Sequence, residues 1–170
     1  MVALRFLLLA VLLTLARSCG TSTGSQNPAV PLTPESVQGC YELSIAKWSP
    51  DLGEDSVFAT PPKRIILLGE KGSNHFESNG YLLRPAPGEE PSIHRSAYWR
   101  LEGTDKLILV WTTGFSGVEV KLHCQGDALV GKAEPFWDFP RRGRKSKAVA
   151  QRIECETSRP SRGSVDSGNH

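Results

Sequence analysis

The sequence has almost no excess of charge. It contains 20 basic and 18 acidic residues, a formal net charge of +2. Two of the basic residues, Arg5 and Arg17, lie in an N-terminal segment that we expect to be removed. A nucleic-acid-binding domain draws much of its affinity from a basic surface that neutralises phosphates. The balanced charge therefore predicts no nucleic-acid partner.

Residue patterns for metal binding and catalysis are also missing. The histidines are never spaced as H-x-H or H-x₃-H, and the sequence has no C-x-x-C, so we expect no metal and no cofactor. Residues 114–117 (GFSG) resemble the start of the hydrolase pattern G-x-S-x-G. Val118 stands where the last glycine is required, however, and no helix is expected to follow. A hydrolase built on Ser116 with His94 or His123 is therefore only the third of three functional hypotheses, and the sequence favours a protein that is not an enzyme.

Only one apolar run stands out near the start of the chain. Residues 6–16 are apolar and follow Arg5, which is typical of a secretory signal and too short for a transmembrane helix. We therefore expect residues 1–18 to be a signal peptide. Cys19 comes next and resembles the lipidated cysteine of a bacterial lipobox, with ordinary secretion as the alternative. The expected location is the cell envelope, with the chain anchored through Cys19 on a periplasmic or outer-membrane surface.

The rest of the chain predicts one all-β domain. Residues 19–36 are predicted to be a flexible linker, 37–156 the domain and 157–170 a disordered tail. Short apolar runs alternate with turn residues throughout the domain, and no helical pattern is convincing. Eight strands are predicted at 37–45, 63–68, 80–84, 92–101, 106–112, 118–124, 128–134 and 147–156. Short connections favour an antiparallel up-and-down barrel, with a two-sheet sandwich as the second choice.

An up-and-down barrel predicts which cysteines pair. Odd strands run one way and even strands the other, so Cys40, Cys124 and Cys155 all fall at one end. The first and last strands are neighbours after closure, which favours a Cys40–Cys155 disulfide in an oxidising compartment. The pairs Cys124–Cys155 and Cys40–Cys124 are the alternatives.

Two positions resemble a known family. Gly39-Cys40-Tyr41, followed by an alternating strand, is similar to the G-x-W entry of lipocalins and related calycin barrels, with Tyr in place of Trp. Arg152 is similar to the arginine that packs against that aromatic residue. The signal segment followed by Cys19 resembles the start of small lipocalin-like bacterial lipoproteins. The resemblance implies that Tyr41 and Arg152 lie together at the closed base of a barrel.

The opposite end of such a barrel carries the expected binding site. Long loops and aromatic residues gather there beside a basic run. This ligand mouth is predicted to consist of Trp48, Phe58, Phe115, Trp137, Phe139, Arg141, Arg142 and Arg144. Apolar side chains with a cationic rim suit a small apolar or amphiphilic ligand, which would have an anionic head. The alternative is a protein-interaction module, such as a hydrolase inhibitor or an envelope-assembly partner, that uses residues 135–146.

Overall fold

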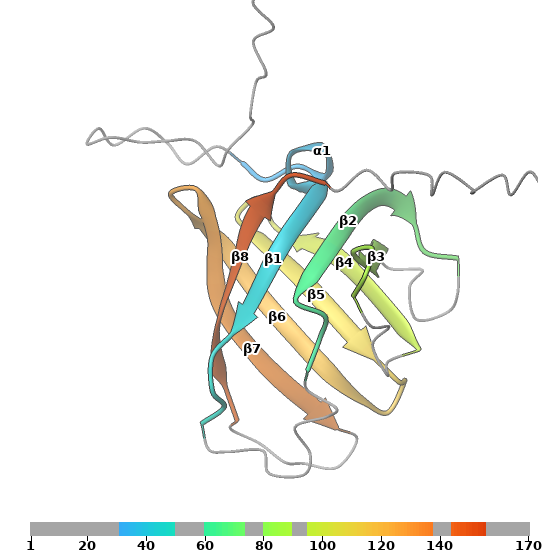
Figure 1. Cartoon of the computed structure of the whole chain (residues 1–170), viewed down its shortest axis with the longest axis vertical. Helices are drawn as coiled ribbons and strands as arrows, with labels where there is room; N and C mark the ends of the chain where they lie inside the picture. The colour runs from blue at the N-terminus through green and yellow to red at the C-terminus, as the bar shows by residue number, and fades with distance from the viewer. Residues whose placement is uncertain (1–30, 50–59, 74–79, 90–94, 138–143, 156–170) are drawn as a thin grey trace, which may run out of the picture.

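The chain folds into a closed barrel of eight antiparallel strands in sequence order (Figure 1). The computed structural model describes residues 31–49, 60–73, 80–89, 95–137 and 144–155. Each strand pairs with its neighbours in sequence, and β1 pairs with β8 to close the sheet. The predicted up-and-down barrel is confirmed, and the sandwich is excluded.

The strands match the predicted segments in order and number. They are β1 (Gly39–Ile45), β2 (Arg64–Lys71), β3 (Tyr81–Pro85), β4 (Ser96–Glu102), β5 (Lys106–Thr112), β6 (Ser116–Gln125), β7 (Ala128–Trp137) and β8 (Ser146–Ile153). Among the described residues, no helix is long and apolar enough to cross a membrane.

Alternation along the strands builds the core. Successive side chains of a strand point to opposite faces of the sheet, so every second residue enters the barrel. Tyr41 and Leu43 of β1 are buried, and so are Val118, Val120 and Leu122 of β6. Trp99 and Trp111 are the largest of the fully buried side chains. The indole N–H of Trp99 donates to the carbonyl oxygen of Leu68 at 2.9 Å, so the polar atom of this ring is satisfied.

A short helix precedes the barrel, where the sequence predicted linker followed by strand. Helix α1 spans Pro34–Val37, and Thr33 caps it by accepting a hydrogen bond from the Ser36 amide. Proline in the first helical turn and a threonine cap favour this turn of helix. Val37 ends the helix and is buried in the core, so β1 begins at Gly39 and not at Val37.

Three strands extend two or more residues into segments that were predicted to be loops or turns. Strand β2 continues to Lys71 after a register shift, although 69–71 were expected in a loop, because the main chain pairs with β3 while the side chains stay exposed. Strand β6 begins at Ser116 and not at Val118. Strand β7 runs on to Trp137, through residues predicted as loop. Pro135 is tolerated there because it lies beyond the last β7–β8 residue pair, Ala133 with Ser146.

The two ends of the barrel are distinct. The end where β1 starts and β8 stops is called the base, and the opposite end is called the open end. Helix α1 lies at the base, which is uppermost in Figure 1. The Leu32 amide donates to the carbonyl oxygen of Thr104 in the β4–β5 turn at 2.7 Å, so the chain enters at this end. Cys155 lies here too, so both ends of the described chain leave the base.

Candidate functional site

The base is closed by covalent and polar contacts. Cys40 and Cys155 form a disulfide with a Cα–Cα distance of 5.2 Å, and the predicted pairing is thereby confirmed. Of the described cysteines, Cys124 is the one that takes no part in this disulfide. The disulfide joins β1 to the residues just after β8 across a sequence separation of 115.

Arg152 connects three elements at the base. Its guanidinium donates to the carbonyl oxygens of Gln38 and Ser36 at 2.9 and 2.6 Å, and to the Tyr41 hydroxyl at 2.7 Å. The guanidinium also lies 5.1 Å from the centre of the Tyr41 ring. Tyr41 in turn donates its hydroxyl hydrogen to the carbonyl oxygen of Val37. The two residues named by the lipocalin resemblance are therefore in contact, and they fasten α1 to β1 and β8.

At the open end, β1 and β8 stay together beyond their strand limits. The main chains of Ser49 and Lys145 form an antiparallel bridge with hydrogen bonds in both directions. The Ser146 hydroxyl donates to the carbonyl oxygen of Ala46. This extension places Trp48 against the core at the open end, where its side chain is partly buried.

The other aromatic residues of the open end differ in exposure. Trp137 is the last residue of β7, pairs with Ser116 and is partly buried. Phe115 lies in the β5–β6 turn, and 74% of its surface is exposed. Phe136 packs over Gly117, where an added Cβ would lie 2.7 Å from the phenyl ring and would overlap the carbonyl oxygen of Trp111. Aromatic side chains at this end thus range from partly buried to largely exposed.

Hydrogen bonds hold the Phe115 turn in one shape. The Thr113 hydroxyl accepts from the amide of Ser116 at 3.1 Å, and the two hydroxyl groups are 3.1 Å apart. The Thr112 hydroxyl accepts from the amide of Gly114, whose φ of 100° suits a residue without a side chain. The Ser116 hydroxyl therefore belongs to the turn, and this gives the hydrolase hypothesis no support.

The barrel interior is lined by buried apolar side chains and by some that are partly exposed. Ile45, Tyr81, Ala97, Leu101 and Cys124 are only partly buried and pack against the core. The buried hydrophobic side chains of the strands expose between 0 and 4% of their surface. They include Tyr41, Leu43, Ile65, Leu67, Leu83, Trp99, Leu107, Leu109, Trp111, Val118, Val120, Leu122, Leu129, Ala133, Ala148 and Ala150. At Gly131 an added Cβ would overlap the carbonyl oxygen of Lys121, so the neighbouring main chain approaches closely there.

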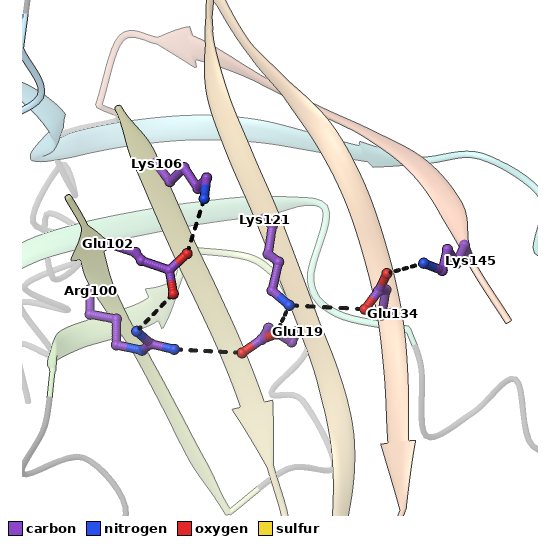
Figure 2. A network of polar contacts seen from close by, with 7 residues as sticks. All are labelled: Arg100, Glu102, Lys106, Glu119, Lys121, Glu134 and Lys145. Carbon is purple, nitrogen blue, oxygen red and sulfur yellow. Dashed lines mark hydrogen bonds and ion pairs between the residues drawn. The ribbon is translucent and has the colours of Figure 1, made fainter. Parts of the chain in front are cut away.

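A second candidate surface is the charged array on the outer wall (Figure 2). Seven side chains alternate in sign from β4 to Lys145, the residue before β8, and form ion pairs with N–O distances of 2.8 to 4.0 Å. They are Arg100, Glu102, Lys106, Glu119, Lys121, Glu134 and Lys145.

Ile108 and Val110 of β5, on the outer face by alternation, are nevertheless buried. By register, Ile108 lies between Arg100 of β4 and Lys121 of β6. Val110 lies between Tyr98 of β4 and Glu119 of β6. The array therefore covers an apolar strip of the wall.

Among the described residues, three carboxylate or ammonium groups have shifted pKa values. The Lys145 ammonium donates a hydrogen bond to Glu134 and lowers the pKa of that carboxyl below 4.5. Glu119 raises the pKa of Lys121 by the same kind of contact. Arg64 lowers the pKa of Glu89, whose carboxylate also accepts from the Lys63 amide and holds the turn after β3 against β2. These shifts follow from ion pairs at the surface and do not indicate an acid–base catalyst.

Several predicted site residues lie outside the described residues. These are Cys19, Phe58, Phe139, Arg141 and Arg142. Of the rest of the predicted mouth, Trp48, Phe115, Trp137 and Arg144 all lie at the open end, where Arg144 precedes the bridge to Ser49. Within the described part of the chain, no group of three or more His, Cys, Asp or Glu side chains could hold a metal ion.

Sequence reasoning placed Lys145 at the rim and Thr113 in a turn but missed the contacts that fix the open end. Thr113 bonds to Ser116 in its own turn, whereas Lys145 and Glu89 form ion pairs with residues farther away in the sequence. The only local signal was the polar, β-branched pair Thr112-Thr113 before a glycine, which is typical of a turn held by side-chain hydroxyls.

Comparisons with known proteins return no relative. No protein-family model matches the chain, and neither a curated protein nor a solved structure matches it. The closed eight-stranded barrel is consistent with a lipocalin-like fold. Membership of that family and the lipoprotein assignment remain predictions.

Proposed function

We propose that this chain is an exported binding protein of the cell envelope, tethered through Cys19, with no catalytic role. It binds a small apolar or amphiphilic ligand at the open end of the barrel. The supporting observation is the distribution of aromatic side chains: Trp99 and Trp111 are fully buried, whereas Trp48 and Trp137 are partly covered and Phe115 is exposed.

Burial of the core supports a ligand site at the rim. Because Trp99 and Trp111 are fully buried, the apolar part of a ligand would contact the partly exposed Trp48 and Trp137. Arg144 precedes the Ser49–Lys145 bridge at the same end, and its positive charge would attract an anionic head. A fatty acid is the simplest molecule with this combination of groups.

Binding of a fluorescent fatty acid tests this proposal. The wild-type chain should saturate with the probe, and native mass spectrometry should detect co-purified lipid. Trp137→Ala should weaken binding by roughly tenfold, since an aromatic contact and its buried area contribute about 1.5 kcal/mol or more. Val149→Ala on the outer wall is the matched control. Absence of both probe response and co-purified lipid contradicts the proposal.

A protein-interaction module is the second candidate. It is favoured by Phe115, which a hydrogen-bonded turn holds in solvent, since exposed aromatic residues on rigid elements are common anchors in interfaces. This module would use residues 135–146. Combined Trp137→Ala and Phe139→Ala substitutions should then abolish capture of the partner while the barrel stays folded. Unchanged capture would contradict this candidate.

A further inference from the structure

The charges of the barrel are separated along its axis. At each end of the barrel we counted the charged residues among the described connections. The two residues of each strand that lie nearest to that end were included in the count. The open end has eight basic residues and one acidic residue: Lys47, Lys63, Arg64, Arg84, Arg95, Arg144, Lys145 and Lys147 against Glu89. The base has three basic and six acidic residues: Lys71, Lys106 and Arg152 against Glu35, Glu70, Glu102, Asp105, Asp127 and Glu154. The balanced net charge of the chain hides this separation.

The residues of these connections that lie outside the described ranges do not reverse the separation of charge. In the sequence, those of the open-end connections add five acidic and two basic residues, and those of the β2–β3 connection add Glu77. The open end therefore stays positive and the base negative. Ion pairs within the open end, such as Arg64 with Glu89, are included in this count.

An apolar side chain projects from the positive end. Phe115 has the largest exposure of the described large hydrophobic residues, and Thr112 and Thr113 fix its turn. A rigid turn loses little conformational entropy when Phe115 becomes buried. Little of the free energy gained by burying this side chain is therefore offset. Trp48 and Trp137, partly buried, lie at the same end. An exposed Phe, tryptophans at an interface and an excess of basic residues together match the requirements of binding to an anionic lipid surface.

We infer that the open end docks on an anionic lipid bilayer, with Phe115 inserted below the head groups. This inference rests on the proposed function, and it names the bilayer as the place where the amphiphilic ligand is exchanged. An anionic surface attracts the open end and repels the acidic base, so charge alone gives the barrel one orientation.

A tether at the base is compatible with this orientation. The twelve residues 19–30 could span at most about 40 Å when fully extended. The longest strands have ten residues, which correspond to about 33 Å. A chain held at Cys19 can therefore turn its open end to the same bilayer, and tethering makes even a weak second contact effective.

Lipid quenching at two positions tests the orientation. An environment-sensitive fluorescent amino acid is incorporated at position 115 or at position 127, which is exposed in the β6–β7 turn of the base. Each full chain is mixed with vesicles of phosphatidylcholine and phosphatidylglycerol at 4:1 that contain brominated lipid. We expect several-fold stronger quenching at 115 than at 127, and loss of the difference with pure phosphatidylcholine or in high salt. Attachment through the N-terminal segment, which leaves the base, would favour quenching at 127, so stronger quenching at 115 cannot arise from that attachment.

Two variants identify the contribution of Phe115. With the label at position 95, which is exposed at the open end, Phe115→Ser should reduce the quenching several-fold. Val149→Ser, at the other exposed large hydrophobic residue, should not change it. Equal quenching at 115 and 127, stronger quenching at 127, or no quenching at either position overturns the inference. A response of the label at 115 to an acidic protein fraction but not to vesicles also overturns it, in favour of a protein partner.

Failure of bilayer docking and failure of the proposed ligand binding can be told apart. Fatty-acid binding by the wild-type chain is measured in solution without vesicles. If it persists while the quenching pattern fails, ligand binding stands and bilayer docking falls. If fatty-acid binding is absent, the proposed function falls first.

Discussion

The base and the open end of the barrel are held together by different kinds of interaction. The base has a disulfide between Cys40 and Cys155 and an arginine that hydrogen bonds to α1 and β1. The open end has a main-chain bridge between Ser49 and Lys145, two ion pairs and a turn held by hydroxyl groups. Two of the contacts at the open end involve carboxylates, those of Glu89 and Glu134, whose pKa values are lowered by their basic partners.

This difference predicts that the two ends differ in local stability. We expect the disulfide and the buried tyrosine to make the base more resistant to opening than the open end. The open end keeps aromatic side chains partly or fully exposed, as the proposed binding requires. Binding surfaces are commonly placed in regions of lower local stability.

Removal of the disulfide should have the largest effect. In the chain-entropy model, a bond that closes a loop of about 100 residues contributes roughly 4–5 kcal/mol. Reduction of the wild-type protein should therefore lower the free energy of unfolding by about this amount, measured by urea denaturation. Cys124→Ala should leave the response to reductant intact. A Cys40→Ala, Cys155→Ala double variant should not respond, and if it did, the base would not depend on this bond.

Arg152→Lys should have the next largest effect. Lysine keeps the charge but cannot reach the Ser36 and Gln38 carbonyl oxygens and the Tyr41 hydroxyl together. We expect a loss of about 2 kcal/mol in the free energy of unfolding, because charge-assisted hydrogen bonds are replaced by weaker ones. Arg100→Lys in the outer charged array is the matched control and should cost less than about 0.5 kcal/mol. Equal effects would show that the base is not specially fastened.

Acidification should loosen the open end before the base. The pKa values of Glu134 and Glu89 are lowered by Lys145 and Arg64. Their contribution to stability is therefore present above the ordinary carboxyl pKa of 4.5 and is lost as the pH falls through the lowered values. Amide hydrogen exchange of Ser49 should become less protected in that acidic range.

Glu134→Gln provides the control for this pH effect. Glutamine cannot form the ion pair with Lys145, so exchange at the open end should already be faster at neutral pH and should depend less on acidification. Loss of protection at Tyr41 in the same pH range would contradict the difference between the two ends.

Phe115→Ala should have the smallest effect on stability. Because 74% of its surface is exposed, we expect the free energy of unfolding to change by no more than about 0.5 kcal/mol. Trp111→Ala, only four residues earlier and fully buried, should cost about 3–5 kcal/mol. Thermal denaturation of both variants tests this contrast. A large loss for Phe115→Ala would mean that the residue serves the fold and not an interface.

The sequence by itself determined the sheet and its closure. A period of two in apolar residues is a local property, so each strand and its inward face could be predicted from neighbours along the chain. An even number of short, sequentially paired strands then placed Cys40 beside Cys155. The same reasoning brought Trp48, Phe115, Trp137 and Arg144 to one end, and the structure places them there.

Tertiary structure alone decided how that end is built. Exposure of Phe115, partial burial of Trp137 and complete burial of Trp99 and Trp111 depend on side chains from several strands, and no local pattern contains them. The continuation of β7 through Pro135 became possible only because β8 begins to pair at Ser146. The separation of charge along the axis is also a tertiary property, because loops from alternate connections share one end whatever their distance in the sequence.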